Sequence, residues 1–139
     1  MKIKPGVDIR GIQPEMTLAL SVAKSTYYDL GGATWVKDFT LTSGLEGKHS
    51  TGSLHYVGLA GDIRTRHVPR SEHSRLAEKL RENLGARPFE TPQIPGQYDV
   101  VLHSSHIHIE FDPNEGDPRR ELAHNRTERV PQEELLRFA

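Results

Sequence analysis

The stretch His106-Ile107-His108-Ile109-Glu110-Phe111 alternates polar and apolar side chains without a break. Because successive side chains of a strand point to opposite faces, this alternation predicts a strand with one apolar face against a core. The imidazoles of His106 and His108 then project together from the other face. Such a pair suits a metal site, but it also occurs on ordinary strand surfaces.

Three further strands are predicted from segments rich in β-forming residues. Residues 98–102 precede the alternating stretch closely enough to form a hairpin with it. Residues 39–43 and 59–64 are the other two. Residues 87–97, with three prolines, are expected to be an irregular connection.

Two helices are predicted, each with recognisable ends. The first begins at Pro14, which favours a first helical turn, and is expected to stop at Gly31-Gly32. The second has Ser71 as its N-cap and Gly85 as its stop. The expected fold class is therefore α+β, a small and mainly antiparallel sheet with two main helices on one side and a functional cleft on the other.

The size and composition predict a single domain over residues 1–139. Hydrophobic residues make up 35% and charged residues 27%, which is typical of a soluble globular protein with a modest core. Residues 112–139 are highly charged and are expected to be partly flexible. A short apolar patch in this segment can dock a helical turn, and it consists of Leu135, Leu136 and Phe138.

The charge balance excludes two classes of partner. A formal net charge of −1 offers no field to attract nucleic acid or an anionic membrane. No stretch reaches the roughly 20 apolar residues of a membrane span, and the N-terminus lacks the apolar run of a secretory signal. We expect a monomer made in the cytoplasm. With no cysteine, any metal must be held by His, Asp or Glu.

A second cluster of potential metal ligands surrounds the predicted strand 59–64. His55 follows a polar, glycine-rich loop at residues 44–54, and Asp62 comes seven residues later, next to Ile63. A carboxylate in such apolar surroundings needs a partner, and a divalent cation is a good one. Two histidines and one carboxylate, with water in the fourth position, make an open zinc site of the hydrolytic type.

The segments Thr42-Ser43-Gly44, Ser53 to Ile63 and His106-Ile107-His108 together resemble a zinc peptidase superfamily. It comprises D-Ala-D-Ala carboxypeptidases, phage L-alanyl-D-glutamate endopeptidases and penicillin-insensitive murein endopeptidases, and the hedgehog signalling domain shares its fold. The resemblance covers residues 40–111. It implies a Zn²⁺ ion ligated by His55, Asp62 and His108.

The resemblance also implies roles for neighbouring residues. His106 would stabilise the oxyanion of the transition state, and Ser53 would lie near bound substrate. Many members have a glutamate base three residues before the last ligand, where this chain has Ser105. The murein endopeptidases instead carry a His-x-x-His-x-His arrangement, which residues 103–108 reproduce. His103 is therefore the candidate general base.

A second departure concerns the grip on the substrate. The family often has an arginine soon after the Ser-Gly pair to hold a substrate carboxylate, whereas residues 45–47 here are Leu-Glu-Gly. Lys48, Arg64 or Arg66 are the candidates to replace it. The remaining histidines fit no motif and are expected to be solvated; they are His49, His67, His73 and His124.

The function expected from the resemblance is hydrolysis of a peptide bond in bacterial peptidoglycan. An endopeptidase is favoured because the carboxylate-binding arginine is missing, and the context would be phage lysis or a virion-associated enzyme that reaches the cell wall on release. A D-Ala-D-Ala carboxypeptidase and a catalytically inactive zinc-binding module of the same fold are alternatives. A cupin is a further one, although its remaining ligands should lie downstream of the His-x-His pair.

Overall fold

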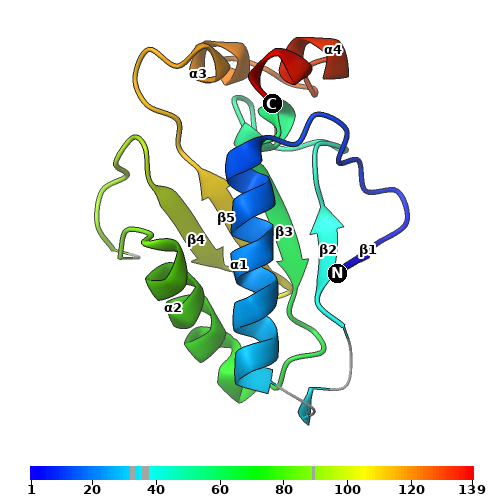
Figure 1. The fold of residues 1–139 in the computed structure, drawn as a ribbon, viewed down its shortest axis with the longest axis vertical. Helices are drawn as coiled ribbons and strands as arrows, with labels where there is room; N and C mark the ends of the chain where they lie inside the picture. The colour runs from blue at the N-terminus through cyan, green and yellow to red at the C-terminus, as the bar shows by residue number, and fades with distance from the viewer. Residues whose placement is uncertain (32–33, 36–37, 89) are drawn as a thin grey trace.

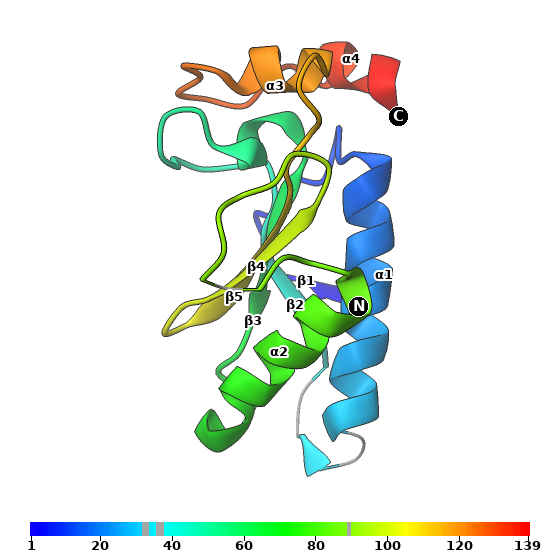
Figure 2. The same ribbon diagram turned by 90° about the vertical axis from the view of Figure 1, so that its left-hand side faces the viewer.

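The computed structural model describes residues 1–31, 34–35, 38–88 and 90–139. The chain forms an α+β fold in which two helices, α1 (Pro14–Gly31) and α2 (His73–Leu84), cover one face of a five-stranded sheet. Figure 2 shows both helices on the same side of the sheet. The predicted layering is thus confirmed. The first helix ends at Gly31, the first residue of the expected Gly31-Gly32 stop, and Gly32 lies outside the described residues.

The sheet is mixed, with the strand order β1-β2-β3-β5-β4 (Figure 1). β1 pairs with β2 in parallel, because α1 intervenes between them and carries the chain back to the same end of the sheet. All other pairs are antiparallel, so the mainly antiparallel sheet that the sequence predicts gains one parallel edge strand. The strands are β1 (Lys2–Ile3), β2 (Thr40–Ser43), β3 (Ala60–Arg64), β4 (Tyr98–Leu102) and β5 (His106–Phe111).

The alternation in β5 separates a core face from a cleft face, as predicted. Ile107 and Ile109 are completely buried in the main apolar cluster between the sheet and the helices. His106 and His108 line a cleft on the opposite face. Since β5 lies between β3 and β4, it is held on both edges and presents these side chains rigidly.

The second helix begins one residue later than the sequence predicts, with Glu72 as its N-cap. Ser71 is not its N-cap, because the chain after Pro69 first makes a turn of 3₁₀-helix, η3 (Arg70–Glu72). α2 then buries Leu76, Ala77 and Leu80 and ends at Gly85 in a left-handed conformation, as expected. No described helix is long and apolar enough to cross a membrane.

The charged C-terminal segment is folded across one end of the sheet (Figure 1). It contains α3 (Pro118–Ala123), α4 (Gln132–Leu135) and η4 (Leu136–Phe138). Of the predicted apolar patch, Leu135 is fully buried, whereas Leu136 is 54% exposed. A second apolar cluster joins this segment to the loop region before β3, and it consists of Leu45, Val57, Leu59, Ala123, Val130 and Leu135.

Candidate metal centre

His55 is positioned by a short 3₁₀-helix, η2 (Leu54–Val57). Ser53 caps this helix, and its Oγ accepts a hydrogen bond from the backbone N–H of His55 at 3.1 Å. Gly58 ends the helix at φ 73°, where a Cβ would collide with the carbonyl oxygen of Gly11. The local sequence therefore fixes the turn that carries His55 into the interior, where it is only 3% exposed.

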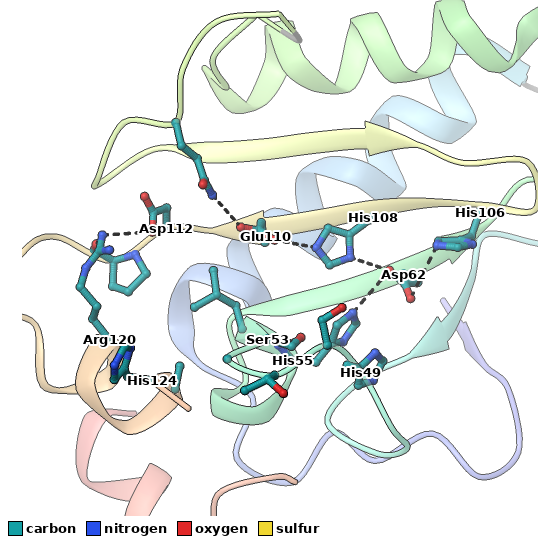
Figure 3. Close-up of a pocket in the computed structure, with 17 residues that line it drawn as sticks. His49, Ser53, His55, Asp62, His106, His108, Glu110, Asp112, Arg120 and His124 are labelled. Carbon is teal, nitrogen blue, oxygen red and sulfur yellow. Dashed lines mark hydrogen bonds and ion pairs between the residues drawn. The ribbon is translucent and has the colours of Figure 1, made fainter. Parts of the chain in front are cut away.

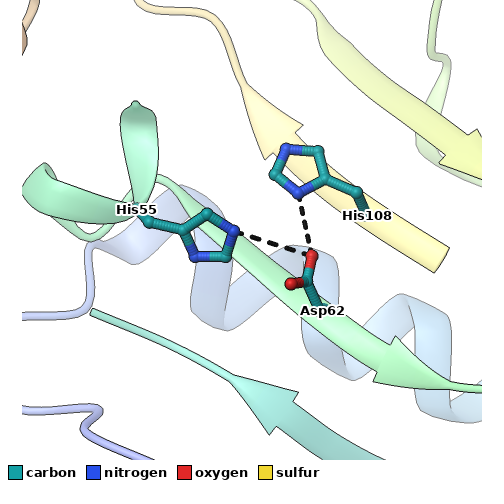
Figure 4. Close-up of side chains that lie close together, drawn as sticks. All are labelled: His55, Asp62 and His108. Carbon is teal, nitrogen blue, oxygen red and sulfur yellow. Dashed lines mark hydrogen bonds and ion pairs between the residues drawn. The ribbon is translucent and has the colours of Figure 1, made fainter. Parts of the chain in front are cut away.

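Asp62 and His108 are direct cross-strand neighbours on β3 and β5. Their side chains meet on the cleft face, and Nδ1 of His108 lies 2.8 Å from Oδ1 of Asp62. Nε2 of His55 approaches the same carboxylate oxygen to 3.6 Å (Figure 4). The sequence prediction that these three residues converge is confirmed, since one ligand atom from each lies within 4.8 Å of the others.

The hydrogen bonds around the cluster decide which nitrogens are free to bind a metal. Nδ1 of His55 lies 2.7 Å from the carbonyl oxygen of Gly44, and because a carbonyl only accepts, Nδ1 carries the proton. The lone pair of Nε2 therefore faces Asp62. Nε2 of His108 donates in the same way to the carboxylate of Glu110 at 2.7 Å, which leaves Nδ1 on the side of Asp62.

The charge of the cluster is matched to a cation. Burial lowers the pKa of His108, but the carboxylates of Asp62 and Glu110 outweigh this and raise the pKa to about 9. Burial likewise raises the pKa of Asp62, yet the hydrogen bond with His108 and the nearby ring of His55 hold it well below its usual range. The two carboxylates therefore favour a positive charge at His108, and a metal ion bound there would replace the proton that carries it.

The donor set fits a divalent metal ion. Two imidazole nitrogens and a carboxylate oxygen, all largely buried, could hold one ion and leave coordination positions open for water or substrate. The other ring nitrogen of each histidine is hydrogen-bonded, which fixes the orientation of both rings. Both other ligands lie upstream of the His-x-His pair, on η2 and β3, and not downstream as a cupin would require.

The cluster lies in a cleft of about 540 Å³. Figure 3 shows the side chains of the candidate metal centre between His106 at one end and Arg120 at the other. One wall is formed by residues 49–55, the last part of the glycine-rich loop together with the start of η2, and another by α3. Ser53 also lines the cleft, so the structure places it beside the site as well as at the cap of η2.

The two predicted catalytic histidines are placed differently. His106 lines the cleft, with Nε2 3.9 Å from Oδ2 of Asp62, and burial lowers its pKa. His103 lies in the turn between β4 and β5, is exposed, and stacks on His106 with ring centroids 4.7 Å apart. It lines a separate surface depression with His73.

The predicted substrate-binding cations lie outside the cleft. Lys48 is exposed in the loop before η2, and Arg66 is exposed after β3. Arg64 lies opposite His106 in the register of β3 and β5, but it is not among the side chains that line the cleft.

Several residues at the site were not predicted from the sequence. Glu110 shares the cleft face with His106 and His108, and the two-residue period of β5 was a sufficient signal for it. His49, expected to be solvated, stacks flat on His55 with centroids 3.9 Å apart and donates from Nε2 to the carbonyl of Glu46. Nothing in its spacing predicts this contact.

Comparison of the chain with protein-family models, with curated proteins and with solved structures returned no match.

Proposed function

We propose that the protein is a zinc-dependent peptidase that hydrolyses a peptide bond in bacterial peptidoglycan. The observation that carries the proposal is the convergence of His55, Asp62 and His108 at the floor of an open cleft. These ligands come from η2, β3 and β5, and their order matches the pattern by which the sequence resembles the zinc peptidases. Zn²⁺ favours such mixed nitrogen and oxygen ligands in hydrolytic sites.

A bound zinc ion would supply a water of lowered pKa and would polarise the scissile carbonyl. The protein itself contributes orientation and proton transfer. Glu110 fixes the ring of His108, and the carbonyl of Gly44 fixes that of His55. Because His106 lines the cleft, we assign it the role that would take a proton from the attacking water and return it to the leaving amine, and His103, which stacks on it, would be a positioning residue.

A carboxypeptidase is the second candidate, because the cleft contains an arginine that was not predicted from the sequence and a carboxypeptidase needs a cation for the terminal carboxylate. Arg120 of α3 lines the cleft and could hold a terminal carboxylate. An endopeptidase would use the same arginine for a carboxylate inside the peptide. The two candidates differ in which carboxylate of the substrate is bound.

Metal content and hydrolysis, measured on the same samples, test the proposal. We expect one zinc per chain by elemental analysis of the purified protein and clearing of a purified peptidoglycan suspension. His55→Ala and Asp62→Asn should lose both the zinc and the clearing. His73→Ala is the matched control, since His73 lies at the start of α2, outside the cleft.

Other outcomes would point elsewhere. Stoichiometric zinc without hydrolysis of any wall peptide would favour the zinc-binding module. Stoichiometric iron would contradict the peptidase proposal, because two histidines and one carboxylate also form the iron site of non-haem oxygenases.

A further inference from the structure

The end of the cleft away from His106 carries an anchored arginine. Arg120 projects from α3, and Nη2 donates to Oδ1 of Asp112 at 3.1 Å and to the carbonyl oxygen of Pro113 (Figure 3). Asp112 is only 8% exposed and follows β5 directly, so the sheet fixes the anchor. The guanidinium is therefore held in one place without being covered, since the side chain remains 37% exposed.

The anchor leaves part of the guanidinium unused. Nε of Arg120 is buried and has no hydrogen-bond partner among the described residues. Nη1 also has no hydrogen-bond partner in the described part of the chain, because both side-chain hydrogen bonds of Arg120 are donated by Nη2. Because Nε is buried and its N–H lies on the side of Nη2, Nη1 is the donor that remains for a ligand, and it can form a charge-assisted hydrogen bond with a carboxylate.

The charges around the cleft single out this position for an anion. Among the described residues that line the cleft, Arg120 is the only lysine or arginine, whereas Asp62, Glu110 and Asp112 are acidic. An anionic group of a substrate is therefore repelled along the floor of the cleft unless it reaches the metal or Arg120. His124 lies beside Arg120 and adds a polar ring to the same end (Figure 3).

We infer that Arg120, held by Asp112, binds a carboxylate of the peptide substrate and so sets where the chain lies relative to the metal centre. The inference rests on the proposed function and deepens it. The carboxylate has two sources in a wall peptide, the C-terminus of the chain or the free carboxyl of an internal acidic residue. A terminal carboxylate makes the enzyme a carboxypeptidase, and an internal one makes it an endopeptidase.

Amidated peptides test the inference on the zinc-loaded wild-type protein, without any variant. The substrate is a synthetic wall pentapeptide, compared with one form amidated at the C-terminus and another amidated at the internal D-glutamate carboxyl. Amidation of the recognised carboxylate should raise KM about 10- to 100-fold with little change in kcat, because a charge-assisted hydrogen bond usually contributes that much to affinity. Equal KM for all three peptides would overturn the inference.

Variants assign the effect to Arg120. With Arg120→Gln the KM for the free acid should rise to that of the amide, so that the difference between them disappears. Arg120→Lys keeps the positive charge and should retain part of the KM difference between the acid and the amide. Arg75→Gln is the control and should keep the full difference, since Arg75 lies on α2 across the sheet and its side chain is 64% exposed. A difference that survives Arg120→Gln in folded protein would also overturn the inference.

Failure of the proposed function has its own signature. If the zinc-loaded protein cleaves none of the peptides, calorimetric titration with the same acid and amide forms still measures carboxylate binding. Tighter binding of the acid, lost in Arg120→Gln, would support the inference alone. Equal binding, or none, would overturn it together with the proposed function.

Discussion

At the scale of single residues, the candidate metal site depends on partners outside its three potential ligands. Oε1 of Glu110 accepts a hydrogen bond from Nε2–H of His108. The side-chain amide of Gln93 donates to Oε2 of Glu110 at 3.1 Å and to Oδ2 of Asp99 at 2.9 Å. This chain of contacts fixes the tautomer and the ring plane of His108. Outer partners of this kind usually decide how tightly the inner ligands hold their ion.

Glu110→Gln should therefore weaken zinc binding about 10- to 100-fold without removing a ligand. The amide of glutamine fills the same space but lacks the negative charge that makes the His108 ring a stronger metal ligand. Competition with a chromogenic chelator measures the affinity. Glu115→Gln is the matched control, because Glu115 is exposed in the loop before α3. Unchanged affinity in the Glu110 variant would show that the contact is incidental.

His106 and His103 should separate kinetically. His106→Ala is expected to keep stoichiometric zinc but to lower kcat about 10²- to 10⁴-fold, the usual contribution of a proton-transfer residue. His103→Ala should lower kcat less than about tenfold, because it stacks on His106 from outside the cleft. Hydrolysis of a fluorogenic wall peptide gives both values. A larger loss in the His103 variant would return the role of general base to His103.

At the scale of elements, η2 is the piece of backbone on which the site depends most. Gly58 closes it in the left-handed region with a Cβ position that collides with Gly11. Gly58→Ala should cost about 1–2 kcal/mol for the backbone alone and more for the displaced neighbour. Zinc affinity should fall as well, because His55 moves with the turn.

Gly85→Ala separates these two costs. Gly85 also has a left-handed φ of 62°, but nothing lies within 4 Å of its Cβ position. Thermal unfolding of both variants, followed by circular dichroism, should show a clearly larger drop in Tm for Gly58→Ala. Equal drops in Tm would mean that the backbone at Gly11 moves away from the new Cβ without a measurable loss of stability.

The elements differ in how far the sequence could predict them. β4 and β5 have the predicted bounds, because strict alternation and β-branched residues agree with the hairpin. The start of α2 could not be placed, since a serine N-cap competes with the 3₁₀ turn after Pro69 and only packing decides. β1 was missed because two residues carry no periodicity and their pairing with β2 is long-range.

At the scale of the whole molecule, the C-terminal segment shows that a highly charged sequence can still contain buried ion pairs. Arg119 reads as a surface residue, yet it is 8% exposed and donates to Glu15 across more than a hundred residues and to Asp117 nearby. Arg129 donates similarly to Asp8. A sequence pattern cannot reveal such pairs, because their partners lie on the N-terminal region. The Arg120 end of the cleft depends on this packing, and so does its place opposite His106.

These ion pairs should make the protein sensitive to acid. Hydrogen bonds from Arg119 hold the pKa of Glu15 and of Asp117 below their usual ranges, and Arg10 and Arg129 do the same for Asp8. A carboxyl whose pKa is lower in the folded than in the unfolded chain stabilises the fold above its unfolded pKa. That stabilisation disappears as the pH falls through both values. Tm should therefore be steady at neutral pH and fall from about pH 5 downward.

Arg119→Met tests whether this cluster is responsible. Removing a largely buried guanidinium strands Glu15 and Asp117, so Tm at pH 7 should fall by an amount equivalent to about 3 kcal/mol. Because both carboxyls then lose the partner that lowers their pKa, the further fall between pH 5 and pH 3 should be smaller than in the wild type. Scanning calorimetry across that range measures both effects. Parallel curves for the two proteins would place the acid sensitivity in other carboxylates, and the C-terminal segment would then be held mainly by the apolar contacts of Val130 and Leu135.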